Sequence, residues 1–255
     1  MHDTVAAFYD LLAPYYHLIF EDWEQSIGRQ AGALNAILER ELGPGTLKVL
    51  DCACGIGTQS IGFASRGHRV VGSDQSVAVV DRARHEMELR GLHGKFAVSD
   101  MTSLAEIEER DFDVVVALDN ALPHLSAGQL GDAVRAMHAR LRPCGLFVAG
   151  IRDYDAMIRE RPTVQGPVFY GQAGRRRIVQ QVWDWIDDRS YFVHLYITVE
   201  QDARWESHHF VTTYRCLLRD ELSAKLASAG FQGIRWIMPG ESGFHQSIVL
   251  ARKEP

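Results

Sequence analysis

Short apolar runs alternate with segments of helical periodicity along the middle of the chain. Three consecutive valines, residues 114–116, are typical of a central strand that is buried on both faces. Strands that alternate with helices indicate right-handed βαβ crossovers and a doubly wound parallel sheet. The pattern predicts strands at 48–53, 68–73, 95–98, 112–118 and 145–151, and helices at 22–42, 58–66, 77–89 and 128–141.

The rhythm changes after residue 154, where three successive apolar segments follow one another without a helix between them. These segments, 177–186, 191–199 and 208–217, predict a three-stranded antiparallel meander inserted after the fifth strand. A helix at 219–229 and strands at 233–238 and 246–252 then complete an α/β, mostly parallel, seven-stranded sheet. We therefore expect three parts: a helical lid or cap at 1–46, a core at 47–154 and 218–255, and an inserted β cap at 155–217.

The N-terminal segment is rich in aromatic residues, and Pro14 divides residues 5–20 into two short helical turns. Tyr9, Tyr16 and Trp23 suit a lid that excludes water from a bound ligand. Packing against the sheet explains the same residues, so both interpretations stay open.

Composition narrows the class of protein. Of the 255 residues, 46% are hydrophobic and 24% charged, as in ordinary globular proteins, and the formal net charge is −6. The acidic balance argues against nucleic acid as a partner, and the run 175–177 of three arginines suits a solvated strand start. The four cysteines make no CxxC pair, and neither a signal peptide nor an apolar stretch of about 20 residues is present. We predict a cytoplasmic protein with no membrane partner.

A glycine-containing loop follows the first predicted strand. Gly55 and Gly57 lie where that strand must turn into a helix, and glycine tolerates the unusual dihedrals and lets a ligand approach the backbone. The N-terminus of the next helix offers unpaired N–H groups. Two glycines alone are compatible with several nucleotides.

Acidic residues make the loop more specific. Asp74 ends the second strand about 20 residues after Gly55, the separation expected of an acid that holds ribose hydroxyls. Asp51, Asp100 and Asp119 also fall at the carboxyl ends of strands, where doubly wound folds bind ligands. Four acids would repel a pyrophosphate but suit a sulfonium and an ammonium group. This charge pattern favours S-adenosylmethionine over NAD.

The segments VLDCACGIGTQSI (49–61), VVGSDQS (70–76), SDM (99–101) and FDVVVALDNALPHL (112–125) resemble the class I S-adenosylmethionine-dependent methyltransferases, which have a Rossmann-like fold. The resemblance covers residues 47–151 and implies that S-adenosylhomocysteine is the product. A Rossmann fold that uses another nucleotide is the alternative. The implied cofactor contacts are Asp51, Ala53, Gly55 and Gly57 at the methionine part, Asp74, Gln75 and Ser76 at the ribose, Asp100 and Met101 at the adenine, Asp119 and Asn120 near the sulfonium, and Tyr16 and Trp23 in the lid.

Residues 120–125, 151–155, 196–200 and 213–215 resemble the branch typified by glycine N-methyltransferase and glycine/sarcosine N-methyltransferases. In this chain Asp119 replaces the glycine that precedes the asparagine in that branch. The resemblance implies that Arg152 clamps a substrate carboxylate and that Asn120 orients the amine. An ion pair of Arg152 with Asp153 or Asp155 is the structural alternative.

The remaining substrate-side residues are less specific. His124 and His194 are candidate bases, although a base is not required and His124 also suits a structural role. Within 191–199 one face is apolar, and the mixed face with His194 and Tyr196 suits either a pocket wall or a homo-oligomer surface. We also place Tyr154 and Tyr214 among the substrate contacts. For Tyr214, Trp183 and Trp185 a core role is the default, and a cap over the substrate is the alternative.

No group of histidines, cysteines and acids has the spacing of a zinc site, so we predict no metal. The leading hypothesis is an enzyme that methylates the amine nitrogen of an amino acid or related carboxylate-bearing small molecule. Its rivals are an O- or C-methyltransferase of a small natural product and a non-catalytic S-adenosylmethionine-binding protein.

Overall fold

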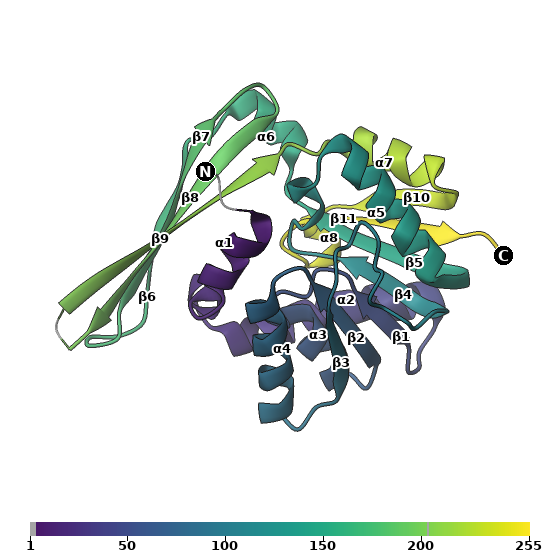
Figure 1. Ribbon diagram of the computed structural model, residues 1–255, viewed down its shortest axis with the longest axis horizontal. Coiled ribbons are helices and arrows are strands. Elements are labelled where there is room, and N and C mark those ends of the chain that lie inside the picture. Colours follow the sequence, from purple (N-terminus) through teal and green to yellow (C-terminus); the bar gives the residue numbers. More distant parts are fainter. Residues whose placement is uncertain (1–3, 203) are drawn as a thin grey trace.

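The computed structural model describes residues 4–202 and 204–255, and in this part of the chain two sheets form (Figure 1). The larger has seven strands in the order β10-β11-β5-β4-β1-β2-β3. Strands β1 to β5 pair in parallel, whereas β11 is antiparallel to both β5 and β10. Its strands are β1 (Lys48–Asp51), β2 (Arg69–Asp74), β3 (Gly94–Val98), β4 (Phe112–Ala117), β5 (Leu141–Ile151), β10 (Phe231–Ile237) and β11 (Ser247–Lys253). The predicted doubly wound α/β fold is confirmed.

Helices cover both faces of this sheet. Val115 belongs to the same buried cluster as Leu130 of α5, while Val114 and Val116 pack on the opposite side with Leu34 of α2. Strand β4 is therefore buried on both faces, as its run of valines predicts. The helices are α1 (Val5–Leu12), α2 (Trp23–Leu42), α3 (Thr58–Ser65), α4 (Val77–Leu89), α5 (Ala127–Arg140), α6 (Tyr154–Glu160), α7 (Arg219–Ser228) and α8 (Pro239–Ser242), with two 3-10 helices, η1 (Tyr16–Ile19) and η2 (Leu122–His124).

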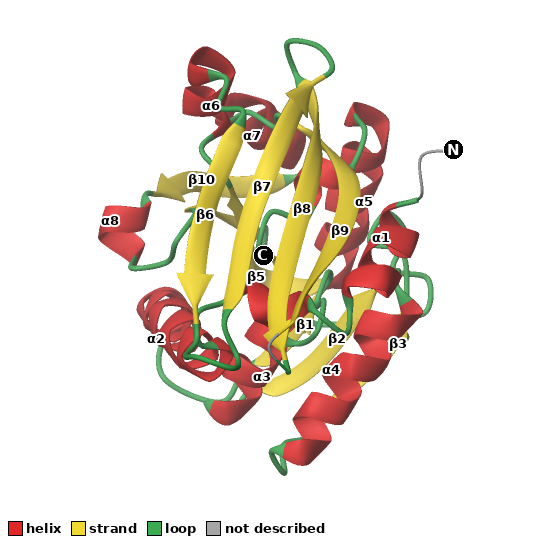
Figure 2. Ribbon diagram, turned by 90° about the vertical axis from the view of Figure 1, so that its left-hand side faces the viewer, coloured by secondary structure: helices red, strands yellow, loops and turns green. Residues whose placement is uncertain are grey.

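The second sheet is antiparallel, with the order β6-β7-β8-β9 (Figure 2). It comprises β6 (Val164–Tyr170), β7 (Arg177–Trp185), β8 (Ser190–Gln201) and β9 (Arg204–Arg215). The prediction of three strands is wrong by one, and helix α6 was also missed. Strand β6 is an edge strand whose side chains are mostly exposed, so it lacks the apolar alternation that marked the other three.

Helix α1 lies between the two sheets (Figure 1). Its Phe8 and Leu12 are buried in one cluster with Val179, Leu195 and Ile197 of the four-stranded sheet. Helices α1 and η1 are the two short helical pieces predicted around Pro14. Residues 1–3 of the predicted cap at 1–46 lie outside the described residues, and the division of the chain into three parts stays a prediction. Within the described residues, no helix combines the length and the apolar character that a membrane span requires.

Candidate functional site

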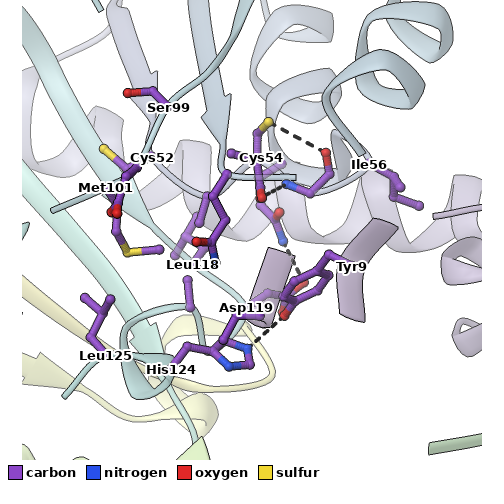
Figure 3. A pocket seen from close by; sticks show the side chains of 18 of the residues that line it. Tyr9, Cys52, Cys54, Ile56, Ser99, Met101, Leu118, Asp119, His124 and Leu125 are labelled. Carbon is purple, nitrogen blue, oxygen red and sulfur yellow. Dashed lines mark hydrogen bonds between the residues drawn. The ribbon is translucent and has the colours of Figure 1, made fainter. Parts of the chain in front are cut away.

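The segments that follow β1, β2, β3 and β4 meet at one edge of the large sheet and line a pocket (Figure 3). The loop after β1 is tied to both neighbouring strands: the Cys52 N–H donates to the Val116 carbonyl at 2.9 Å, and the Cys54 N–H donates to the Ser73 carbonyl at 2.9 Å. Helices α1 and η1 close the opposite side through Tyr9 and Tyr16. This is the edge at which doubly wound folds bind ligands.

The two loop glycines serve different purposes. Gly55 has φ +50°, lines the pocket, and its absent Cβ would lie 3.4 Å from Cε1 of Tyr16. Gly57 has φ +93° at the N-terminus of α3, where a Cβ would lie 3.3 Å from Cβ of Ala83. Gly57 therefore permits the turn and the packing of α3 on α4, and it is not among the residues that line the pocket.

Carboxylates dominate the charge of this pocket. Asp74, Asp100 and Asp119 line it, and no lysine or arginine lies among its described lining residues. Oδ2 of Asp74 accepts the Gly55 N–H at 3.0 Å and Oδ1 accepts the Ser76 N–H at 3.1 Å. Burial raises the pKa of Asp74 to about 6, although these backbone N–H groups act in the opposite direction. A cation fits this pocket, whereas a pyrophosphate would meet three acids.

Most of the predicted cofactor contacts line this pocket together, namely Ala53, Gly55, Asp74, Gln75, Asp100, Met101, Asp119 and Tyr16. Asp51 and Ser76 do not. Asp51 is buried behind the loop, where its Oδ2 accepts the Ser60 hydroxyl at 2.8 Å and burial raises its pKa to about 7. The Ser76 hydroxyl donates to Asp10 of α1 at 2.5 Å. Both residues shape the loops from behind the pocket wall, which corrects their assignment to cofactor contact.

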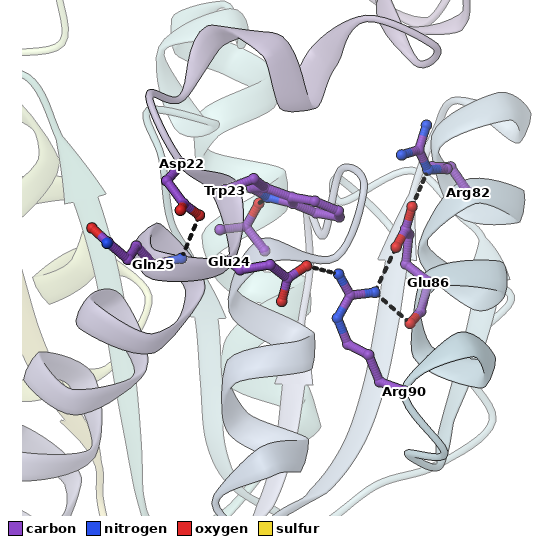
Figure 4. A network of polar contacts seen from close by, with 8 residues as sticks. Asp22, Trp23, Glu24, Gln25, Arg82, Glu86 and Arg90 are labelled. Carbon is purple, nitrogen blue, oxygen red and sulfur yellow. Dashed lines mark hydrogen bonds and ion pairs between the residues drawn. The ribbon is translucent and has the colours of Figure 1, made fainter. Parts of the chain in front are cut away.

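Trp23 is also placed differently from the prediction (Figure 4). Its indole Nε1 donates to the Thr58 hydroxyl at 2.9 Å, and the guanidinium carbons of Arg90 and Arg82 lie 5.2 and 5.9 Å from its ring. Trp23, the first residue of α2, thus packs against α4 and contacts Thr58, the residue that begins α3. It supports the loop through Thr58, which lines the pocket, and is not itself a lid over it.

A second pocket adjoins the first between the large sheet and the four-stranded sheet. The two share Tyr9, Tyr16 and Asp119 in their walls. The second pocket, which we call the acceptor pocket, also includes Asn120, Arg152, Trp183, Val193, Leu195, Thr212, Tyr214, His245 and Gln246. Leu195 and Val193 belong to the apolar face of β8, so this face forms part of the wall of the acceptor pocket.

The mixed face of β8 points away from both pockets, which corrects the prediction of a pocket wall there. Nδ1 of His194 lies 3.0 Å from Nε2 of His209, and its Nε2 lies 3.1 Å from Asp184. Tyr196 stacks on His209 with ring centroids 4.4 Å apart. His194 and Tyr196 therefore interact across the outer surface of the sheet and contact neither pocket.

Arg152 is the arginine of the acceptor pocket. Its guanidinium carbon lies 5.2 Å from the Trp183 ring and 5.3 Å from the Tyr214 ring, and its Nη1 donates to the Tyr191 hydroxyl at 3.3 Å. No carboxylate of the described residues pairs with it. Asp153 and Asp155 instead pair with Arg219, at 3.1 and 3.3 Å, so the structural alternative for Arg152 is wrong.

A closed set of hydrogen bonds holds Arg152 in place. Asn120 accepts the Arg152 backbone N–H at 3.1 Å, and its Nδ2 donates to the Tyr154 hydroxyl at 2.8 Å. The Tyr191 hydroxyl donates to the Tyr154 hydroxyl at 3.3 Å and accepts from the guanidinium. Both ends of the Asn120 amide are occupied and Tyr154 is fully buried, so these residues position Arg152. Tyr154 does not line the acceptor pocket, which corrects its assignment to substrate contact, whereas Asn120 lines the pocket and its role on the amine stays a prediction.

Replacing Tyr191 with Phe tests this positioning role. The Tyr191 hydroxyl accepts from a charged guanidinium, and such a hydrogen bond contributes at least about 1.5 kcal/mol, so we expect the KM of an anionic acceptor to rise about tenfold or more. The Kd of S-adenosylhomocysteine, measured by calorimetry, should stay unchanged. Tyr196→Phe, on the outer face of the same strand, is the matched control. An equal rise of KM in both variants would contradict the positioning role.

His124 connects three elements around the first pocket. Nδ1 lies 3.2 Å from the Thr213 carbonyl of β9 and so carries the proton, which leaves Nε2 to accept the Tyr9 hydroxyl at 3.0 Å (Figure 3). The Tyr214 ring packs 4.1 Å from the imidazole. Burial lowers the pKa of His124 to about 4. A neutral imidazole with both nitrogens occupied is a structural tie, which argues against the predicted base role.

This lowered pKa makes stability depend on pH. The imidazole binds a proton near pH 6.5 when unfolded but only near pH 4 when folded, so its contribution is lost as the pH falls between those values. We expect the stability advantage of the wild type over His124→Gln to shrink by about 2 kcal/mol between pH 7 and pH 4.5. Urea unfolding of both proteins at both pH values measures this difference in the free energy of unfolding. An advantage that does not change with pH would contradict the assignment.

Comparisons with known proteins support the same chemistry. Residues 49–145 match the family described as a methyltransferase domain. The matched segment includes the glycine-containing loop after β1 and the acidic residues of the first pocket. The confirmed expectations are that it is an enzyme of this class and that S-adenosylmethionine is its cofactor.

Three relatives indicate what the chain is similar to. A tRNA 5-carboxymethoxyuridine methyltransferase of Escherichia coli (strain K12) is 26% identical over 71% of this chain and 74% of its own length. CalS10, an amino pentose methyltransferase from Micromonospora echinaspora, has a TM-score of 0.73 at 22% identity, covering 89% of this chain and 92% of that one. The sugar N-methyltransferase KedS8 from Streptoalloteichus has a TM-score of 0.75 at 16% identity, covering 94% and 93%.

Sequence reasoning missed His245, Gln246 and Tyr191 as parts of the site. His245 and Gln246 precede β11, which pairs with β5 and brings them beside Asn120 and Arg152. No local motif marks such residues, because their place depends on the pairing of strands far apart in the chain. Tyr191 lies on the apolar face of β8, whereas the alternation of residues favoured the mixed face as a pocket wall.

Proposed function

We propose that the chain transfers the methyl group of S-adenosylmethionine to the amine nitrogen of a small molecule that also carries an anionic group. The observation that carries this proposal is an arginine of the acceptor pocket without a carboxylate partner among the described residues, next to a pocket lined by carboxylates. The first has three carboxylates and suits the cationic cofactor. The acceptor pocket holds Arg152, a charge without a carboxylate partner among the described residues.

Arg152 is part-buried, and a guanidinium that is withdrawn from water is costly unless a counter-charge approaches it. Its planar fork matches a carboxylate or a phosphate through two parallel hydrogen bonds. The guanidinium lies beside the rings of Trp183 and Tyr214 in the pocket wall, and one of its N–H groups donates to the Tyr191 hydroxyl. The anion of the acceptor would take the remaining donors.

Asp119 lies at the junction of the two pockets and would attract the ammonium end of the same acceptor. An acceptor held at its anion by Arg152 thus places its nitrogen toward the first pocket, where bound S-adenosylmethionine supplies an electrophilic methyl group. Methyl transfer is a displacement in which positioning and exclusion of water supply most of the acceleration. Tyr9 and Tyr16, which line both pockets, would exclude that water.

Amino acids of the glycine and sarcosine type satisfy this arrangement. The sugar N-methyltransferase and amino pentose methyltransferase among the structural relatives favour a second acceptor class, an amino sugar that carries a phosphate. The tRNA 5-carboxymethoxyuridine methyltransferase favours a third class, an acceptor with a carboxylic acid group and no amine, although the net charge of −6 argues against tRNA as a partner.

The test is label transfer from methyl-labelled S-adenosylmethionine to a panel of paired acceptors. Sarcosine, β-alanine and glucosamine 6-phosphate carry an anion; sarcosinamide, propylamine and glucosamine are their uncharged partners. Phenols and a carboxylic acid without an amine, such as phenoxyacetate, complete the panel. We expect transfer to at least one anionic amine and little to its uncharged partner. Transfer confined to phenols or to the carboxylic acid would overturn the proposal, as would cofactor binding with no transfer to any amine.

A further inference from the structure

His245 contributes an imidazole to the acceptor pocket from the segment between α8 and β11. Its Nε2 lies 2.7 Å from Oδ1 of Asp119, and its side chain is 49% exposed. The pair joins a residue from the carboxyl end of β4 to one that precedes β11, and it lies where the two pockets meet.

Asp119 is held firmly on its other side. Its Oδ2 accepts the Nε2–H of Gln59 at 3.0 Å, and Gln59 also donates to Gln30 at 2.7 Å. Asp119 and Asn120 both have left-handed backbone, with φ of 53° and 68°. Two consecutive non-glycine residues in this region are strained, and such strain persists where the surrounding structure holds a functional geometry.

The contact with Asp119 determines the tautomer of His245. A carboxylate accepts a proton from Nε2–H, so the lone pair of the neutral imidazole is on Nδ1. Nδ1 has no hydrogen-bond partner among the described residues. A histidine oriented by a carboxylate, with its second nitrogen open, is the arrangement of a general base.

The charged and titratable groups that share this pocket with His245 come from several elements. They include Asp119 after β4, Arg152 at the end of β5, and Tyr16 of η1, which is neutral because burial raises its pKa. His124 has both nitrogens occupied and His194 lies on the outer face of the small sheet. His245 is thus the histidine of the acceptor pocket with an open nitrogen.

We propose that His245, oriented by Asp119, takes the proton from the ammonium group of the acceptor before methyl transfer; this rests on the proposed function. The N–H bond breaks, the proton bonds to Nδ1, and the electron pair stays on the amine nitrogen. That pair then forms the bond to the methyl carbon, and the electrons of the broken C–S bond stay on sulfur. The imidazolium, paired with Asp119 and half exposed, returns its proton to water.

The test is the pH profile of kcat/KM for wild type and His245→Gln, with the panel amine that accepts most label. At pH 7 we expect the variant to fall about 100-fold, the size typical of a lost general base. The variant should recover about tenfold per pH unit as free amine replaces ammonium, and added imidazole should restore part of the rate at pH 7. Cofactor affinity, measured by calorimetry, should not change.

His85→Gln on the exposed surface of α4 is the matched control and should behave as wild type. A wild type that methylates no panel amine contradicts the proposed function. A wild type that methylates an amine, together with a His245→Gln variant that keeps the wild-type rate and pH profile, overturns only the role of His245. A uniform loss that neither higher pH nor imidazole restores also overturns it, since that pattern indicates a structural role.

Discussion

Arg152→Ala is expected to lower kcat/KM for an anionic amine about 100- to 1000-fold, mainly through KM. Removing one partner of a desolvated charge pair costs about 2–5 kcal/mol, and the partner that we propose for Arg152 is the anion of the acceptor. The Kd of S-adenosylhomocysteine should stay unchanged, because Arg152 lies in the acceptor pocket and not in the acidic one. Steady-state kinetics and calorimetry measure the two effects separately.

Two further variants sharpen this prediction. Arg152→Lys keeps the positive charge but loses the planar fork, so we expect an intermediate loss. Arg219→Ala removes a nearby arginine that pairs with Asp153 and Asp155 outside the pocket, and it should leave KM unchanged. The clamp is contradicted if Arg152→Ala leaves KM unchanged, or if the anionic and uncharged members of an acceptor pair lose activity equally.

The core of the fold was predictable because its signals are local. Val114 to Val116 show a strand buried on both faces, and glycine at 55 marks the turn into the next helix. Because these signals are local, they do not reveal elements that depend on pairing with a distant segment. Strand β6 is an exposed edge strand, and its identity depends on pairing with β7, which no pattern within 164–170 shows.

The residues of the site likewise fall into those that local sequence signals predict and those that they do not. Asp74, Asp100 and Asp119 could be predicted because each follows a strand whose carboxyl end faces the same edge. Which face of β8 turns inward could not, since both alternating faces are rich in large side chains. The apolar face forms the pocket wall because α1 contributes Phe8 and Leu12 to the same cluster.

Arg152 shows what a resemblance can and cannot supply. The sequence suggested a clamp and left an ion pair with Asp153 or Asp155 open, and only the structure shows Arg219 occupying both acids. The structure adds a second role for Asn120, because its amide also bonds to Arg152 and Tyr154. Hydrogen-bond partners are a tertiary property, so motif spacing does not reveal them.

Asp74→Ala is expected to raise the Kd of S-adenosylhomocysteine about 100-fold or more. The substitution removes the carboxylate proposed to accept two ribose hydroxyls, and hydrogen bonds to a charged group contribute about 1.5–3 kcal/mol each. It also releases the Gly55 and Ser76 N–H groups that shape the loop.

The pH dependence of the wild type provides an independent measurement of the same carboxylate. Burial raises the pKa of Asp74 to about 6, and the hydroxyls of the ribose favour its ionised form. Cofactor affinity should therefore fall as the pH drops through about 6, and the Asp74→Ala variant should lack this dependence. Asp81→Ala, an exposed residue of α4 paired with Arg84, is the control and should bind as wild type. If calorimetry found the Asp74→Ala affinity within threefold of wild type, the ribose would have to be held elsewhere, and the acidic edge would act through its overall charge alone.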